Sequence, residues 1–185
     1  MNNILFINAC PRQNSRTLEL ARSVLEKMNG QVLEVRLFEG EPLHLTRERL
    51  QQREQLVASN SFSDPMFCCA RQFAEADEIV LATPYWDLMF PAVVRGYFEA
   101  VTVSGLTFTY GENGVPRGLC KAKRLIYVTT SGGPIFRNFG FDYVDALARA
   151  FYGIPETKCV KAEGLDIWGA DVAKLLNEAK AIWSD

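Results

Sequence analysis

The chain has 185 residues, of which 48% are hydrophobic and 23% are charged, and its formal net charge is −2. The length is typical of one domain, the near-neutral charge gives no long-range attraction to nucleic acid or an anionic membrane, and no apolar run approaches the ~20 residues of a membrane-spanning helix. Five cysteines without CxxC spacing favour a reducing cytoplasm over a disulfide framework, and the single histidine, His44, argues against a metal site or a histidine-based catalytic centre.

Strands and helices are predicted to alternate along the chain. In chain order the predicted elements are a strand (3–8), a helix (15–28), a strand (31–38), a short capped helix (46–49) within a polar irregular segment (40–65), the end of a helix (67–76), a strand (78–83), a helix (91–103), a turn-rich excursion (about 104–123), a strand (124–130), a helix (141–151), a strand (157–162) and a closing amphipathic helix (170–183).

This alternation predicts an α/β protein in which helices cover both faces of a parallel sheet. Five strands in this length predict a three-layer, flavodoxin-like fold with strand order 2-1-3-4-5, formed by residues 1–185 as a single domain. Ligands of such sheets bind outside the carboxyl ends of the strands. The loops after the first, third and fourth strands are therefore the candidate site.

The loop after the first predicted strand, residues 8–17, has features of a phosphate site. Asn14, Ser15 and Thr17 place amide and hydroxyl groups at a helix N-terminus, where free N–H groups and the positive end of the helix dipole favour an anion. Arg16 adds a candidate cationic contact. Ordinary helix capping explains the residues about as well, and the position after the first strand favours phosphate. The loop has no GxGxxG or Walker sequence, which argues against a dinucleotide Rossmann site and a P-loop NTPase.

The same loop satisfies C-x5-R-[ST], the pattern of the nucleophile loop of protein tyrosine phosphatases. In that alternative, Cys10 is a thiolate nucleophile at a helix N-terminus and Arg16 grips the phosphoryl group. Phosphatase loops also use glycine to bring the backbone close to phosphate, whereas this loop has none and carries Pro11. We rank a cysteine-dependent phosphatase below a cofactor site, and Cys10 is also a small residue suited to a strand end.

The loop after the third predicted strand, residues 83–91, carries bulky apolar side chains in succession. Tyr85, Trp86 and Leu88 offer a wall on which a flat conjugated ligand stacks. Asp87 lies among them and either fixes the local backbone, caps the following helix or meets the edge of the ligand. A dimer interface or a satellite of the core are alternatives that the sequence leaves open.

The loop after the fourth predicted strand contains Thr130-Ser131-Gly132-Gly133. Its glycines allow close backbone approach, and free N–H groups can donate to the carbonyl oxygens of a ring. Taken alone, the segment is better explained as a tight turn. Beside the other two loops it completes a phosphate seat, an apolar wall and a donor-rich turn, which match the phosphate, flat ring and polar pyrimidine edge of FMN.

On these loops and one further segment, the sequence resembles the FMN-dependent NAD(P)H:quinone oxidoreductase and azoreductase family, whose fold is flavodoxin-like. The resemblance spans nearly the whole chain. Its most distinctive part is the segment at 107–119, which reads TFTYGENGVPRGL, together with Pro84-Tyr85-Trp86-Asp87 and Phe90-Pro91.

The resemblance implies which residues contact FMN. The phosphate loop of the family falls on Cys10, Ser15, Arg16 and Thr17, the ring-contacting loop on Pro84, Tyr85, Trp86, Asp87 and Leu88, and the pyrimidine-edge turn on Thr130, Ser131, Gly132 and Gly133. Cys10 stands where the family often has serine and Asp87 where asparagine is common, which affects one phosphate contact and the redox tuning of the flavin. The family is dimeric with sites at the subunit interface, so Phe108 and Tyr110 either reach toward the partner's flavin or only pack the excursion.

The resemblance also implies an enzyme. Hydride passes from NADH or NADPH through FMN to a quinone, azo compound or similar flat acceptor in a ping-pong cycle that needs no protein nucleophile, base or metal. We expect a homodimer that binds no nucleic acid and does not insert into membranes. A flavin-binding electron carrier is a further alternative, against which the net charge of −2 argues because carriers are usually strongly acidic.

Overall fold

The computed structural model describes residues 1–40 and 43–183, so the parts of our predictions that fall on residues 41, 42, 184 and 185 lie outside the described residues. The helical elements are α1 (Arg16–Leu25), α2 (Arg47–Ala58), the 3-10 turn η1 (Pro65–Phe67), α3 (Cys68–Glu75), α4 (Ala92–Val101), α5 (Phe139–Leu147), the π-helical turn η2 (Ala148–Tyr152) and α6 (Val172–Ile182). The strands are β1 (Asn3–Asn8), β2 (Gln31–Arg36), β3 (Glu78–Ala82), β4 (Phe108–Tyr110), β5 (Pro116–Gly118), β6 (Arg124–Thr130) and β7 (Glu156–Ala162).

One parallel sheet organises the fold. Its order is β2-β1-β3-β6-β7, and Ile4 in β1 aligns with Val32 on one side and Glu78 on the other. Because β4 and β5 form a separate ribbon, this order is 2-1-3-4-5 among the sheet strands. The predicted flavodoxin-like α/β fold is therefore confirmed. From β1 the chain first adds β2 on one side of β1 and then β3 on its other side. Sheets of this kind bind ligands at such a switch point in strand order, here between β1 and β3.

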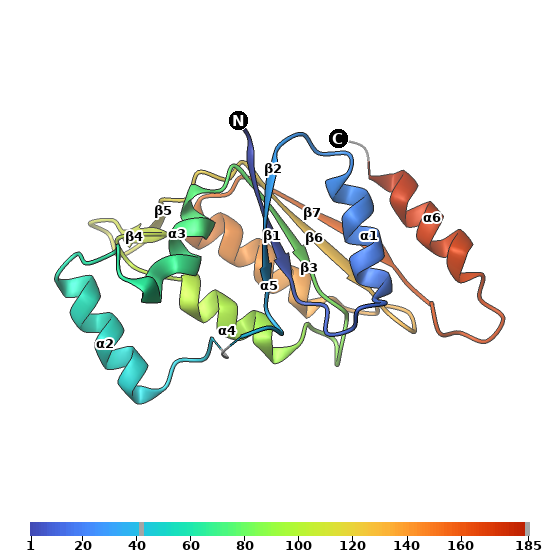
Figure 1. Cartoon of the computed structure of the whole chain (residues 1–185), viewed down its shortest axis with the longest axis horizontal. Coiled ribbons are helices and arrows are strands. Elements are labelled where there is room, and N and C mark those ends of the chain that lie inside the picture. Colours follow the sequence, from blue (N-terminus) through green and yellow to red (C-terminus); the bar gives the residue numbers. More distant parts are fainter. Residues whose placement is uncertain (41–42, 184–185) are drawn as a thin grey trace.

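Helices cover both faces of the sheet, as Figure 1 shows. On one face, α1 and α6 bury Leu20 and Leu176 in a cluster with Phe6 and Val128 of the sheet. The other face carries α3, α4 and α5. Among the described residues, no helix is long and apolar enough to cross a membrane.

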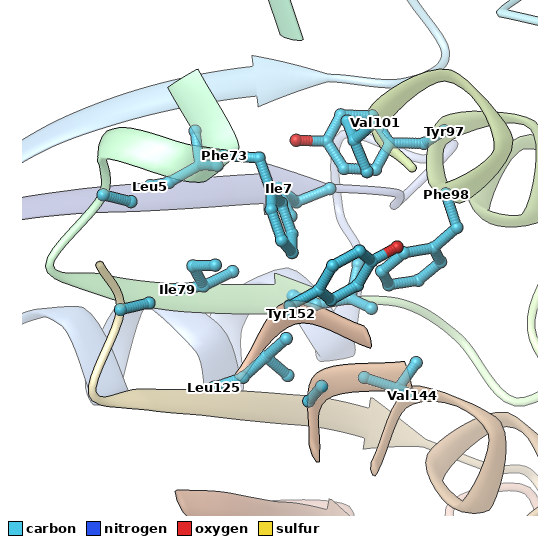
Figure 2. Packing of buried hydrophobic residues seen from close by; sticks show 14 of the residues in the cluster. Leu5, Ile7, Phe73, Ile79, Tyr97, Phe98, Val101, Leu125, Val144 and Tyr152 are labelled. Carbon is cyan, nitrogen blue, oxygen red and sulfur yellow. The ribbon is translucent and has the colours of Figure 1, made fainter. Parts of the chain in front are cut away.

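The core beneath α3 and α4 is aromatic. Figure 2 shows Phe73, Phe98 and Tyr152 gathered near Ile7 and Ile79 of the sheet. The rings of Phe73 and Tyr152 meet edge to face with centroids 4.8 Å apart, and those of Phe98 and Tyr152 stack at 6.4 Å. Burial of each large apolar side chain contributes roughly 1.5–3 kcal/mol to the free energy of unfolding. This aromatic cluster therefore stabilises the helices and strands from which the loops extend.

The segment between β2 and η1 differs from our prediction. Residues 40–65 contain the 12-residue helix α2 rather than irregular chain with one short turn, so that expectation was wrong in extent. Thr46 does cap the helix, because its side chain accepts a hydrogen bond from the first turn. No residue of α2 is buried, and in Figure 1 the helix lies at the edge of the molecule. Leu56 and Val57 of the helix pack against the core, and Arg53 donates to the carbonyl oxygens of Glu99 (2.7 Å) and Thr102 at the end of α4.

The turn-rich excursion contains an antiparallel ribbon. In it Phe108 pairs with Gly118, and Tyr110 pairs with Pro116. Gly118 lies directly on the end of η2, where an added Cβ would come within 2.1 Å of the backbone carbonyl carbon of Tyr152. This close approach requires glycine at position 118, and it packs the ribbon against the end of η2.

Candidate functional site

A cavity of about 350 Å³ opens at the carboxyl edge of the sheet, where the predicted loops meet. Of the thirteen residues predicted to contact the cofactor, nine line it: Ser15, Arg16, Thr17, Pro84, Tyr85, Trp86, Thr130, Ser131 and Gly132. The loops after β1, β3 and β6 are therefore brought together around one space.

The loop between β1 and α1 forms a seat at one end of the cavity. Ser15 is the N-cap residue of α1, and its Oγ accepts a hydrogen bond from the N–H of Leu18 at 3.2 Å. Among the residues that the structure describes, none accepts a hydrogen bond from the backbone N–H groups of Asn14, Arg16 or Thr17. Free donors at the positive end of a helix dipole are suited to an anion such as phosphate.

Thr17 and Thr130 connect the loops. Their Oγ1 atoms lie 2.6 Å apart in a buried hydrogen bond. The backbone N–H of Tyr85 donates to the carbonyl oxygen of Thr130 at 3.0 Å. Three loops are thus held in fixed positions relative to one another by hydrogen bonds at the cavity wall.

The loop after β3 makes a tight turn with left-handed backbone. Trp86 and Met89 exchange both backbone hydrogen bonds at 2.8 Å, and the residues between them, Asp87 and Leu88, have φ of 49° and 68°. Aspartate tolerates this conformation, whereas it strains leucine. Within the described chain, the N–H groups of Asp87 and Leu88 find no acceptor. The turn holds Tyr85 and Trp86 at the cavity, and Trp86 is 42% exposed and so available for stacking.

The loop after β6 forms the donor-rich turn. The N–H of Ser131 donates to the carbonyl oxygen of Ala162 at 3.0 Å, and its hydroxyl donates to the carbonyl oxygen of Gly133. The N–H groups of Gly132 and Gly133 have no acceptor within residues 1–40 and 43–183. They are available to a ligand with ring carbonyl oxygens.

A fourth loop, after β7, belongs to the site and was missed by our sequence prediction. Leu165 and Asp166 line the cavity. The N–H of Asp166 donates to the carbonyl oxygen of Gly132 at 2.9 Å. The Oδ1 atom of Asp166 accepts a hydrogen bond from Nη1 of Arg16 at 2.7 Å. The available signal was topological, because every strand of a parallel sheet ends at the same edge. A single aspartate in a loop has no motif that would otherwise mark it.

Four predicted residues do not line the cavity. Asp87 and Leu88 follow the lining residue Trp86 in its turn, and Gly133 directly follows the lining residue Gly132. Cys10 lines a neighbouring polar pocket instead, and its Sγ lies 3.8 Å from the carbonyl oxygen of Ala82.

Cys10 also lacks the properties of a nucleophile. Burial raises the pKa of its thiol to about 11, so the group is protonated at neutral pH, whereas a reactive cysteine needs a lowered pKa. Arg16 lines the cavity, whereas Cys10 lines the neighbouring pocket, so the two residues do not face one space. The phosphatase alternative is therefore not supported.

Phe108 and Tyr110 lie in the ribbon and do not line the cavity of their own chain. Phe108 is buried, with its ring centroid 5.2 Å from that of Phe151. Tyr110 is 57% exposed and meets Phe108 edge to face at 5.3 Å. Phe108 thus packs the ribbon, while Tyr110 presents its ring to the outside.

The cavity fits a flat cofactor that carries a phosphate. Backbone donors at the N-terminus of α1 suit the phosphate, Tyr85 and Trp86 suit the flat ring, and the donors at Gly132 and Gly133 suit a polar ring edge. Fold and cavity together define a flavodoxin-like protein whose cavity suits a flavin nucleotide.

Comparison with known proteins agrees with this class. A family profile described as a flavodoxin-like fold matches residues 2–185. An FMN-dependent NADH:quinone oxidoreductase of Coprothermobacter proteolyticus is 33% identical over 97% of this chain and 94% of that protein. The protein of the same name from Caldicellulosiruptor saccharolyticus is 32% identical over 97% of this chain and 94% of its own length. The chain belongs to the flavodoxin-like family that contains these FMN-dependent NADH:quinone oxidoreductases.

Solved structures share the fold. An FMN-dependent NADH-azoreductase from Bacillus anthracis, solved in complex with FMN, has a TM-score of 0.82 at 22% identity and covers 98% of this chain and 95% of its own. A second azoreductase structure from that species has a TM-score of 0.82 at 23% identity, with 98% of both chains covered.

Proposed function

We propose that the protein is an FMN-dependent oxidoreductase that transfers hydride from NADH or NADPH to a quinone, an azo compound or a similar flat acceptor. The observation that carries the proposal is the four-loop cavity, whose walls combine unpartnered backbone donors with aromatic side chains. Membership of the family supports the identity of the reaction.

The proposal assigns FMN to the residues at this edge of the sheet. The phosphate is held by the loop from Cys10 to Thr17, in which Arg16 adds a charge-assisted contact. Tyr85 and Trp86 hold the ring, and the turn at Gly132 and Gly133 holds its pyrimidine edge. Asp87, Leu88 and Cys10 contribute through backbone position rather than through side chains that line the cavity.

When bound, FMN supplies the redox chemistry by accepting hydride from the nicotinamide and passing reducing equivalents to the acceptor. The protein binds and orients. The free N–H groups at Leu88, Gly132 and Gly133 would hold the polar edge of the ring and would stabilise negative charge there, because the fold already fixes them in its turns. The carboxylate of Asp87 does not line the cavity and that of Asp166 is paired with Arg16, so neither strongly opposes that charge.

A homodimer and a cytoplasmic location are parts of the same proposal. An apolar groove of about 630 Å³ lies between α2, α4 and α5, with Leu50, Phe98 and Phe151 in its lining, and an exposed apolar surface of this kind suits a subunit contact. The exposed ring of Tyr110 is then available to a partner's cavity. All five cysteines of the described chain are free, which fits a reducing compartment.

Flavin titration followed by anaerobic reduction tests the function. We expect the purified protein to quench FMN fluorescence at a one-to-one ratio and NADH or NADPH to bleach the visible flavin band, with a benzoquinone restoring it. Failure to bind FMN would contradict the proposal. Tight FMN binding without bleaching by either nicotinamide would identify an electron carrier instead.

A further inference from the structure

We infer that Asp166 is a positioning residue, which holds the Arg16 guanidinium at the phosphate end of the cavity and so sets how strongly the site prefers FMN to riboflavin, the flavin without phosphate. The inference rests on the proposed function, because it concerns the way in which the same site recognises the flavin phosphate.

The contacts of Arg16 are one-sided. Its Nη1 donates to Oδ1 of Asp166 at 2.7 Å and to the carbonyl oxygen of Leu165 at 3.1 Å. Its Nε and Nη2 have no acceptor within the part of the chain that the structure describes. A guanidinium offers five donors in a planar fork, so anchoring one end leaves the other end free to bind a phosphate oxygen.

An anchor is needed because of where Arg16 stands. It is the first residue of α1, directly after the N-cap Ser15, and a cation is unfavourable at the positive end of a helix dipole. Its side chain is 42% exposed, so an unanchored guanidinium would turn outward into water. The carboxylate of Asp166 offsets the unfavourable placement and fixes the direction of the fork.

Asp166 is itself fixed. Its N–H donates to the carbonyl oxygen of Gly132 at 2.9 Å, and its Oδ2 lies 2.4 Å from the point where a Cβ on Gly132 would be. The absence of a side chain at Gly132 therefore leaves room for this carboxylate. Asp166 connects the phosphate seat to the turn after β6, two parts of the site that come from distant stretches of sequence.

A carboxylate near a phosphate also repels it. This repulsion lowers the affinity for FMN, whereas the positioning of Arg16 raises it. The side chain of Asp166 is 69% exposed, so water and salt screen the repulsion, whereas the hydrogen bond to Arg16 is direct. Positioning therefore outweighs repulsion, and removal of the carboxylate weakens FMN binding.

The test compares the affinities of full-length variants for FMN and riboflavin, measured by quenching of flavin fluorescence. We expect Asp166→Ala to raise the Kd for FMN about tenfold and to leave that for riboflavin within about twofold of wild type. Asp166→Asn keeps an oxygen that can accept from Arg16 and recovers most of the affinity. Arg16→Met loses the same selectivity, and adding Asp166→Ala to it has no further effect because both act through one contact.

Glu19→Ala is the matched control. Glu19 also lies in α1 and forms an exposed ion pair of 2.6 Å, with Lys180, but it does not line the cavity. The control removes the same charge and should leave both affinities unchanged.

Two results would overturn the inference: an Asp166→Ala variant that binds FMN as tightly as wild type or more tightly, or a loss of affinity shared equally by FMN and riboflavin. If Asp166→Ala does not fold, unchanged FMN selectivity in Arg16→Met is decisive against the inference. Failure of the proposed function looks different, because the wild-type protein would then bind neither flavin or would not be reduced by nicotinamide.

Discussion

The chemistry of Cys10 is decided by its surroundings rather than by the motif in which it stands. The C-x5-R-T spacing with Arg16 is present in the sequence, yet the fold directs the Sγ toward the carbonyl oxygen of Ala82 and partly buries the side chain. A motif records spacing along the chain, whereas thiolate formation depends on solvation and on nearby charge. That dependence is why the sequence could raise the phosphatase alternative but could not dismiss it.

The pH dependence of alkylation tests this account of Cys10. A thiol with a pKa of about 11 is ionised to roughly one part in a thousand at pH 8, and the thiolate fraction rises about tenfold with each pH unit above that. We expect iodoacetamide to modify the exposed Cys68 well before Cys10 at pH 7 to 8, with Cys10 catching up only in strong alkali. Peptide mass spectrometry measures both sites in one digest, and equal rates at pH 7 would refute the account.

At the scale of elements, strands were easier to predict than polar helices. The continuous apolar run at β3 is distinctive because the strand is buried on both faces. Helix α2 has strong helix formers but buries no residue, so it has almost no apolar periodicity to detect. In the site, too, the parts with a distinctive residue pattern were predicted, namely the three loops with recognisable residues. The contribution of Asp166 was not, because it depends on the placement of this residue beside Arg16 and Gly132.

The left-handed turn after β3 gives a prediction at this scale. A leucine held at φ 68° costs about 1–2 kcal/mol of conformational strain, which glycine does not incur. After allowance for the greater flexibility of glycine in the unfolded chain, we expect Leu88→Gly to unfold with a free energy about 1 kcal/mol higher than that of Leu88→Ala. Both variants lose the side chain, so the comparison isolates the backbone. Urea denaturation measures the difference, and a more stable alanine variant would show that the turn is not strained.

For the whole molecule, the site is assembled from loops at one edge of the sheet, so a bound flavin stabilises the complete fold. At a concentration 100 times its Kd, a ligand that binds only the native state adds about 2.7 kcal/mol of stability. For a chain of this size the melting temperature should rise by roughly 5–11 °C with FMN. Differential scanning calorimetry with and without FMN measures the shift. Adenosine monophosphate, which has a phosphate but no flavin ring, serves as the control, and an equal shift with it would argue against a flavin site.

The spread of the site along the chain also bears on how the protein is made. Its walls run from the loop after β1 to Asp166, which follows β7, so ribosomal synthesis completes the site only after β7 has been made. A nascent or truncated chain that stops before β7 lacks both an edge strand of the sheet and the partner of Arg16. Binding of the cofactor to the complete site therefore requires that synthesis has passed Asp166.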